Sequence, residues 1–201
     1  MRNTFDRFNG RHQDYQAARP SYAQKFLDWL GELYAPPERY TAADIGSGTG
    51  KLSAQLLAAG FRVCGVEPNP DMRGAAEALL GGDPRFSSSN GTDHDTGLPD
   101  RSVDMVAAAQ AFHWFDGPAF ARECRRILRP GGRAVLVWNV RGSAPMNQAL
   151  AQVFREHCPS FHGFTGGMGE DDPRIRDFFG GAYEKRRFPN PLTLDRDQFL
   201  R

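Results

Sequence analysis

A glycine-rich turn is the feature of this 201-residue sequence that most directly suggests chemistry. Gly46, Gly48 and Gly50 follow an apolar run that ends at Ile45, in the order GSGTG. Glycines allow positive φ angles and let the backbone approach a ligand without a Cβ clash. The unpaired N–H groups of a following helix would point into the same space. The turn predicts a nucleotide-like ligand, although a merely tight turn could use the same residues.

The glycine spacing separates two classes of ligand. A dinucleotide site follows G-x-G-x-x-G, whereas the third glycine here is Gly50, one residue early, and Lys51 stands in the expected place. The phosphate-binding pattern G-x-x-x-x-G-K-[ST] does not occur in the sequence. An NAD-dependent oxidoreductase remains an alternative, because such enzymes also carry an acidic residue after their second strand.

That acidic residue is Glu67, which follows the apolar run at residues 61–66. A carboxylate at the end of this strand can accept hydrogen bonds from both ribose hydroxyls of an adenosine. The alternative is that Glu67 only caps the segment that follows it. The acidic residue and the glycine turn together favour an adenosine-containing ligand.

A cluster of aromatic residues follows another apolar run, at residues 103–109. Its sequence is QAFHWFD, from Gln110 to Asp116, and ligands of open α/β folds bind at this carboxyl edge of the sheet. His113 could act as a base toward a substrate hydroxyl or amine, because histidine has an ordinary pKa of about 6.5. Trp114 could border a positive centre. A structural histidine and ordinary packing of the tryptophan are the alternatives.

These residues need a scaffold, and the apolar periodicity predicts one. Strands and helices alternate, which indicates a parallel sheet with crossover helices on both faces, a Rossmann-like α/β fold. The predicted helices are 21–34, 51–59, 72–80 and 119–128, and the predicted strands are 40–45, 61–66, 103–109 and 133–140.

The regular alternation ends after residue 140. We expect an amphipathic helix at 146–157 with Leu150, Val153 and Phe154 facing inward, a mobile loop at 161–172, a strand within 183–194 and the start of a helix at 195–201. The chain is interpreted as one domain. Its parts are an amino-terminal lid and helix (1–39), a ligand-binding core (40–140) and a substrate-side insertion with an incomplete carboxyl-terminal part (141–201).

Composition argues against several kinds of partner. The 25 basic and 24 acidic residues give no single-sign field that would attract nucleic acid or a membrane surface, so a small molecule is the expected ligand. Three widely spaced cysteines, Cys64, Cys124 and Cys158, suggest neither disulfides nor a metal site. No apolar run reaches 18 residues. We therefore expect reduced thiols and a cytoplasmic protein.

Several short motifs resemble those of a known family. DIGSGTGK, VEPN, LPDRSVD, AFHWFD and LRPGG occur in that order from Asp44 to Gly132. They resemble the class I methyltransferases, particularly the type 11 group that includes trans-aconitate methyltransferase-like enzymes. The segment DYQAARPSY, from Asp14 to Tyr22, also looks like the amino-terminal signature of this group.

The resemblance implies S-adenosylmethionine as the cofactor. Gly46, Ser47, Gly48 and Gly50 would line its methionine and ribose, with Asp44 supporting the loop or binding the ammonium group. By the same resemblance Glu67 would bind the ribose, Pro68 would contact adenine, and the backbone of Gln110 and Ala111 would wrap the cofactor. Family members usually have a small residue and then a carboxylate after Gly91-Thr92, whereas this chain has Asp93, His94 and Asp95. Asp93, with His94 beside it, would then supply the contact to the adenine amino group.

The methyl acceptor is less constrained by the sequence. Tyr15, Arg19, Trp114 and Asn139 are the predicted substrate residues, and the resemblance to the trans-aconitate methyltransferase-like group implies a small carboxylic acid. Positioning alone can supply roughly 7 to 11 kcal/mol of the barrier, so such an enzyme need not have a dedicated base. A carboxylate acceptor would need none.

The carboxyl-terminal part raises a further alternative. By the same resemblance, the family fold normally closes with a helix and an antiparallel strand after the point where this sequence stops. The unpaired sheet edge that results would favour a homodimer. It also leaves open a non-catalytic or weakly active fragment that only binds the cofactor.

Overall fold

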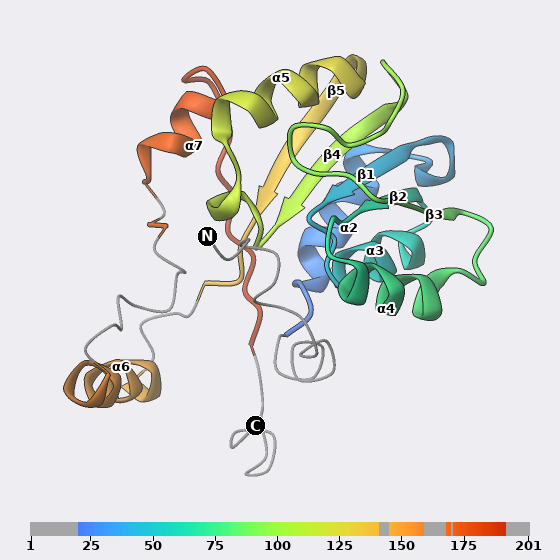
Figure 1. The fold of residues 1–201 in the computed structure, drawn as a ribbon. Helices are drawn as coiled ribbons and strands as arrows, with labels where there is room; N and C mark the ends of the chain where they lie inside the picture. Colours follow the sequence, from blue (N-terminus) through green and yellow to red (C-terminus); the bar gives the residue numbers. More distant parts are fainter. Residues whose placement is uncertain (1–19, 141–144, 159–167, 170, 192–201) are drawn as a thin grey trace.

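The computed structural model describes residues 20–140, 145–158, 168–169 and 171–191. Its described part contains one sheet of five parallel strands in the order β3-β2-β1-β4-β5 (Figure 1). The strands are β1 (Thr41–Ile45), β2 (Arg62–Val66), β3 (Phe86–Ser89), β4 (Val103–Ala109) and β5 (Leu128–Val137). The predicted Rossmann-like α/β fold is confirmed, and within the described residues every strand pair is parallel.

Helices cover both faces of the sheet (Figure 1). One face carries α2 (Gln24–Leu33), α3 (Lys51–Ala58) and α4 (Pro70–Leu80), and the other carries α5 (Gly117–Ile127) and α7 (Pro173–Phe178). Two short 3₁₀ helices, η2 (Pro37–Arg39) and η3 (Phe112–Trp114), lie before β1 and after β4. Alternate strand residues supply the two cores: Ala42 and Met105 pack under α2 and α3, whereas Ala43 and Val106 pack under α5 and α7.

Most predicted elements occur close to their expected positions, and the shifts have local causes. Helix α4 begins at Pro70, two residues earlier than expected, because Asn69 caps it. The Asn69 Oδ1 accepts hydrogen bonds from Asp71 N and Met72 N, both at 3.0 Å. An asparagine cap followed by proline at the first helical position is a favourable helix start. Helix α2 begins at Gln24 rather than at residue 21.

Two strands differ from the sequence prediction. We predicted no position for β3, whose sequence FSSS is short, polar and half-exposed at a sheet edge. Strand β5 runs from Leu128 to Val137 instead of over residues 133–140. Its Pro-Gly-Gly segment is a bulge within the strand, because Leu128 pairs with Val103 while Arg133 pairs with Met105.

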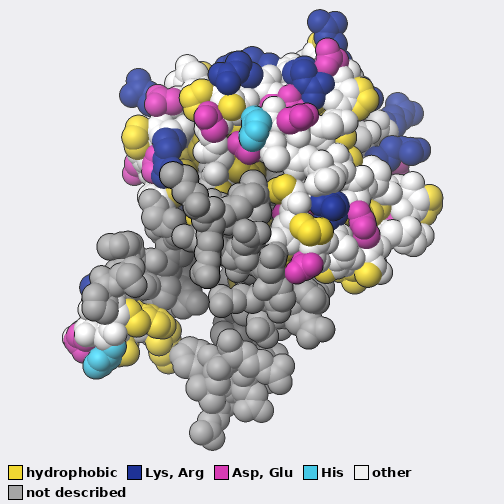
Figure 2. All heavy atoms as spheres, in the orientation of Figure 1, with side chains coloured by type: hydrophobic (Ala, Val, Ile, Leu, Met, Phe, Trp, Pro, Cys, Tyr) yellow, Lys and Arg dark blue, Asp and Glu magenta, His cyan; other side chains and the backbone are white. Residues whose placement is uncertain are grey.

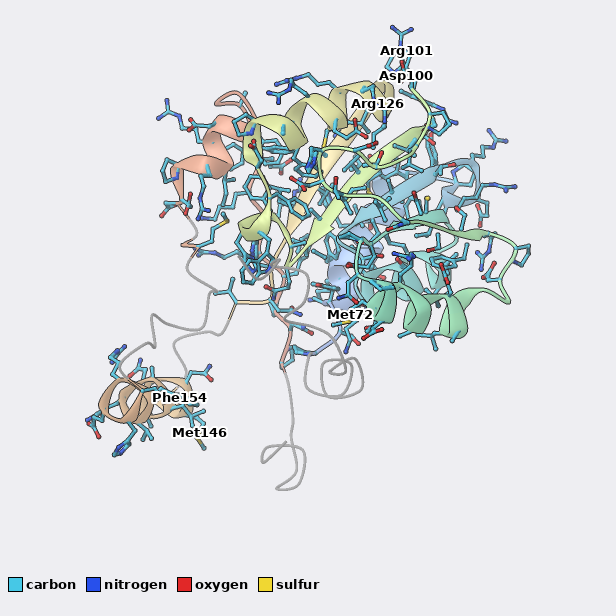
Figure 3. All side chains as sticks on the ribbon, viewed as in Figure 1. Met72, Asp100, Arg101, Arg126, Met146 and Phe154 are labelled. Atoms are coloured by element: carbon cyan, nitrogen blue, oxygen red, sulfur yellow. The ribbon has the colours of Figure 1, made fainter. Side chains whose placement is uncertain are left out.

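The region after β5 was predicted least well. Helix α6 (Pro145–His157) is confirmed, but its apolar side does not face inward: Val153 and Phe154 are 51% and 40% exposed. The helix stands apart from the sheet with apolar side chains on its surface, and Met146 and Phe154 lie on the same side (Figures 2 and 3). Helix α7 was not predicted, and residues 183–191 form no strand. Residues 161–167 and 192–201 lie outside the described part.

A buried carboxylate joins α5 to the loop before β4. Glu123 accepts hydrogen bonds from Thr96 N and Thr96 Oγ1 at 2.9 and 2.6 Å, and from Arg126 Nε and Nη2 at 2.8 and 2.7 Å. Arg126 also binds Asp100 at 2.7 Å, at the far end of α5 (Figure 3). Burial alone would raise the pKa of Glu123, but the hydrogen bonds from Arg126 and Thr96 outweigh it and lower the pKa to about 2.

This network makes stability depend on pH in a defined direction. The pKa of Glu123 is depressed in the folded state, so its contribution is complete above the unfolded value of about 4.3 and is lost as pH falls toward 2. Glu123→Gln should lower the free energy of unfolding at pH 7 by about 1.5–3 kcal/mol. Urea unfolding at pH 7 and near pH 2.5 would measure this, with most of the difference gone at the lower pH.

Glu77→Gln is the matched control, because Glu77 is half-exposed and lies 3.8 Å from Arg73 in a surface ion pair. Such pairs contribute about 0–1 kcal/mol. Equal effects of the two substitutions at pH 7 would contradict the structural role of Glu123.

Candidate functional site

The loop after β1 adopts the conformation that its glycines predict. Gly46, Gly48 and Gly50 have φ angles of 69°, 57° and 81°, all in the left-handed region. The backbone N–H groups of Gly46 and Ser47 both donate to Val66 O, at 2.8 and 3.2 Å. The loop is thereby fastened to the end of β2, and α3 begins directly after it.

The surroundings of the three glycines differ. A Cβ at Gly46 would lie 2.8 Å from Ala111 Cβ, and one at Gly50 would lie 2.8 Å from Leu80 Cδ1. A Cβ at Gly48 would meet no atom within 4 Å. The first and third glycines are therefore needed by the packing of the fold itself, whereas Gly48 borders open space where a ligand can approach the backbone.

Asp44 is a buried carboxylate at the end of β1. Its side chain is 1% exposed, and Oδ2 accepts a hydrogen bond from Ser53 Oγ of α3 at 2.7 Å. Its other oxygen, Oδ1, is buried without a hydrogen-bond partner in the part of the chain that the structure describes. Burial raises the pKa of Asp44 to about 6, partly offset by the Ser53 hydroxyl. The site therefore holds a carboxylate oxygen that a cationic or N–H donor could satisfy.

Glu67 lies beside the same loop at the end of β2. Its Oε2 accepts a hydrogen bond from Gly48 N and its Oε1 accepts one from Asn69 N, both at 2.9 Å. The side chain is buried, and burial raises its pKa. Pro68 follows and is half-buried. Glu67 thus orients the glycine loop and caps the start of the next segment, as the structural alternative in the sequence analysis held. Its contact with a ribose stays a prediction.

The loop after β3 places Asp93 beside the start of α5. One carboxylate oxygen of Asp93 accepts a hydrogen bond from Asp116 N at 3.0 Å, and the other lies 3.2 Å from His94 Nδ1. The His94 side chain is 59% exposed. The contact that ties Asp93 to α5 was not predicted, and the adenine contact of both residues stays a prediction.

The end of β4 comes close to the β1 loop. Gln110 has a φ of 55°, which is uncommon for a residue with a side chain, and its N–H donates to Val137 O at 2.8 Å. The next residue, Ala111, is buried against Gly46. The left-handed turn at Gln110 therefore brings the two predicted cofactor segments together.

His113 and Trp114 lie on η3, immediately beyond this turn. Their ring centroids are 4.8 Å apart, and Trp114 is 48% exposed. Trp138, just after β5, packs edge-on to Phe112 with 6.3 Å between centroids. The indole Nε1 of Trp138 is buried and has no hydrogen-bond partner among the described residues. The aromatic cluster at the strand ends thus includes a buried donor that sequence reasoning did not select.

Asn139 lies at this edge of the sheet, but its side chain forms hydrogen bonds with other residues of the chain. Nδ2 donates to Pro20 O and Ser21 O at 3.3 and 3.4 Å, and Oδ1 accepts from Asn190 Nδ2 at 3.1 Å. These bonds favour a positioning role over a direct substrate contact. The other two predicted substrate residues, Tyr15 and Arg19, lie outside the described residues.

Two supporting residues escaped the sequence prediction. Ser53 holds Asp44, and Asn69 binds the Glu67 carboxylate through its N–H. The pair Asn69-Pro70 could have predicted a helix start, since asparagine is a common cap and proline a common first helical residue. A serine inside the first turn of a helix, such as Ser53 in α3, gives no such indication of its role.

Comparison with known proteins identifies the family. A family model described as a methyltransferase domain matches residues 43–136, which span β1 to β5. An uncharacterized methyltransferase of Mycobacterium tuberculosis is 42% identical over 127 residues, which are 63% of this chain and 49% of that protein. A solved structure from Anaeromyxobacter dehalogenans, described as a proposed type II methyltransferase, shares 31% identity and a TM-score of 0.59 over 88% of this chain and 70% of that one.

The chain belongs to the methyltransferase family. The chain spans about half the length of the curated relatives it matches. A Methanococcus maripaludis protein, proposed to be S-adenosyl-L-methionine-dependent, shares the fold at 21% identity, with a TM-score of 0.56 over 81% of this chain and 85% of that one. The trans-aconitate-like subgroup is not distinguished by these similarities.

The described part of the chain lacks two kinds of feature. No helix there is both long and apolar enough to cross a membrane. No group of three or more His, Cys, Asp or Glu residues there is arranged to hold a metal ion.

The glycine geometry predicts two different stability effects. Gly46→Ala should destabilise the protein by about 2–5 kcal/mol, because it combines a left-handed conformation with a clash against Ala111. Gly48→Ala should cost only about 1–2 kcal/mol, since its Cβ enters open space. Chemical denaturation of both variants would compare them. An equal loss in the two variants would argue against the close approach of β1 and β4.

Proposed function

We propose that this chain binds S-adenosylmethionine at the junction of β1 and β4 and transfers a methyl group to a small organic acceptor. The observation that carries the proposal is the pair of buried carboxylates, Asp44 and Glu67, around a glycine loop that is open at Gly48. One oxygen of Asp44 lacks a partner among the described residues. An ammonium group at that oxygen would supply the missing donor.

The residues present fit the cofactor in kind. Glu67 would accept hydrogen bonds from the ribose hydroxyls, and Asp44 would bind the ammonium group of the methionine portion. The backbone of the loop Gly46–Gly50 would contact the cofactor. Pro68, Asp93 and His94 would border the adenine, and the backbone of Gln110 and Ala111 would close the other side. When bound, S-adenosylmethionine supplies an electrophilic methyl group on a sulfonium that already carries its leaving group.

The role of the chain is then mainly to position the reactants and to exclude water. Aligned reactants can gain roughly 7 to 11 kcal/mol from proximity and orientation. Trp114 would border the positive centre or the acceptor. We propose a carboxylic acid as the acceptor. Its oxygens could accept a hydrogen bond from the buried N–H of Trp138, as the oxygen of a phenol or an alcohol also could. His113 would act as a base only for a hydroxyl or amine acceptor.

Glu67→Gln tests the cofactor assignment. The substitution keeps the shape of the side chain but removes its charge, so S-adenosylhomocysteine should bind about 10- to 150-fold more weakly, the equivalent of roughly 1.5–3 kcal/mol. Isothermal titration calorimetry with S-adenosylhomocysteine and NAD would measure this, with Glu77→Gln as the control. Binding of NAD alone to the unsubstituted chain would instead support an oxidoreductase.

His113→Gln tests the acceptor class. A general base contributes roughly 10²- to 10⁴-fold to the rate of methyl transfer. A carboxylate acceptor needs no base, so with such an acceptor the turnover of His113→Gln should fall by less than about tenfold. Methyl-labelled S-adenosylmethionine would be incubated with separate pools of small carboxylic acids, phenols and amines, and labelled products measured by mass spectrometry. Label only in phenols or amines, abolished in the variant, would contradict the acid. Binding without any labelled product would support a non-catalytic protein.

A further inference from the structure

Three amide side chains from distant parts of the sequence converge on the backbone of residues 20–22. Gln55 of α3 pairs with Tyr22: Oε1 accepts from Tyr22 N at 2.9 Å, and Nε2 donates to Tyr22 O at 3.0 Å. Asn139 Nδ2 donates to the carbonyls of Pro20 and Ser21, and Asn190 Nδ2 donates to Ser21 O at 2.8 Å. We call Gln55, Asn139 and Asn190 the amide clasp.

The amide clasp is connected to the end of β4. Asn190 Nδ2 also donates to Asn139 Oδ1 at 3.1 Å, and the backbone carbonyl of Asn139 accepts from Gln110 Nε2 at 3.1 Å. A continuous series of hydrogen bonds therefore runs from Ser21 and Asn190, through Asn139, to Gln110. The first two positions belong to opposite ends of the described chain, and the last lies beside the glycine loop.

Gln110 is the residue whose conformation needs such support. Its φ of 55° lies in the left-handed region, and it is held by its N–H bond to Val137 O and its side-chain bond to Asn139 O. Sparsely populated conformations persist where the surroundings over-determine them, and they cluster at ligand sites. Here the conformation directs Ala111 against Gly46.

We propose that the amide clasp is a positioning device, in which Asn139 transmits the docking of residues 20–22 and Asn190 to Gln110 and so fixes the backbone at Gln110 and Ala111 for ligand binding. The identity of the ligand rests on the proposed function. Asn139 and Asn190 are partly buried, and neither belongs to the hydrophobic cores. Water can replace much of their hydrogen bonding, so these contacts fix geometry more than they add stability.

The decisive variants are Asn139→Ala and Asn190→Ala. Each should raise the dissociation constant of S-adenosylhomocysteine about 3- to 10-fold, a range typical of coupling through hydrogen-bonded groups. The double variant should bind S-adenosylhomocysteine no more weakly than whichever single variant has the lower affinity, because both residues act through the same series of hydrogen bonds. Gln24→Ala is the matched control, since Gln24 Nε2 bonds Asp28 Oδ1 on the exposed side of α2, close to but outside the clasp.

A second measurement does not depend on the ligand. Hydrogen exchange of the Gln110 amide in the ligand-free protein should be faster in Asn139→Ala and Asn190→Ala than in the Gln24→Ala control, because its backbone is held less firmly. Should Asn139→Ala fail to fold, Asn190→Ala still provides the test, since Asn190 lies outside every helix and strand of the described residues.

The possible results separate the two proposals. Unchanged affinity and unchanged Gln110 exchange would overturn the positioning role, as would a lower melting temperature with unchanged affinity. Lack of S-adenosylhomocysteine binding by the unsubstituted chain would refute the proposed cofactor instead. In that case faster Gln110 exchange would still support the clasp, and unchanged exchange would overturn it.

Discussion

The close approach of the β1 loop to the end of β4 is the constraint on which the site depends. Strands β1 and β4 are neighbours in the sheet, but the chain leaves β1 toward β2 and β3 and returns through β4 toward β5. At this change of direction the connecting segments diverge, which leaves room for a ligand at the carboxyl edge. The room is narrow at its base, because Gly46 and Ala111 touch there. Left-handed residues on both sides, Gly46 and Gln110, make that contact possible.

The same approach explains the electrostatics of the site. Asp44 and Glu67 are both buried near the loop, and the charge on Glu67 contributes to the raised pKa of Asp44. Two carboxylates in a poorly solvated space destabilise each other unless donors or cations compensate them. Backbone N–H groups donate hydrogen bonds to both carboxylate oxygens of Glu67, whereas the Ser53 hydroxyl donates to only one oxygen of Asp44. The balance that remains favours a ligand with a positive charge and N–H donors, which accords with an amino-acid-bearing sulfonium.

How far the sequence predicted this arrangement depends on whether each signal was local. Strand β4 is apolar except for Asp104, and the GSGTG turn fixes its own conformation, so both were found at the expected residues. Strand β3 was missed because an edge strand of polar residues has no hydrophobic period. Helix α6 had the right period, but periodicity shows only that one side is apolar and not what covers it, so the inward prediction for Val153 and Phe154 was wrong.

The candidate site follows the same rule. Motif residues such as Asp44, Glu67 and Ala111 stand at strand ends, and parallel strands must bring their carboxyl ends to one edge. The hydrogen bonds that connect Ser21, Asn139 and Asn190 could not be predicted in this way. Asn139 and Asn190 are 51 residues apart in the sequence, and Asn139 and Ser21 are 118 apart. Amide side chains carry no hydrophobic signal, and their pairing depends on where the loops return. Asn139 was selected as a substrate residue from its position after a strand, yet that position equally suits a residue that fixes the neighbouring strand end. Strand ends therefore predict where a ligand binds better than they predict which polar side chain touches it.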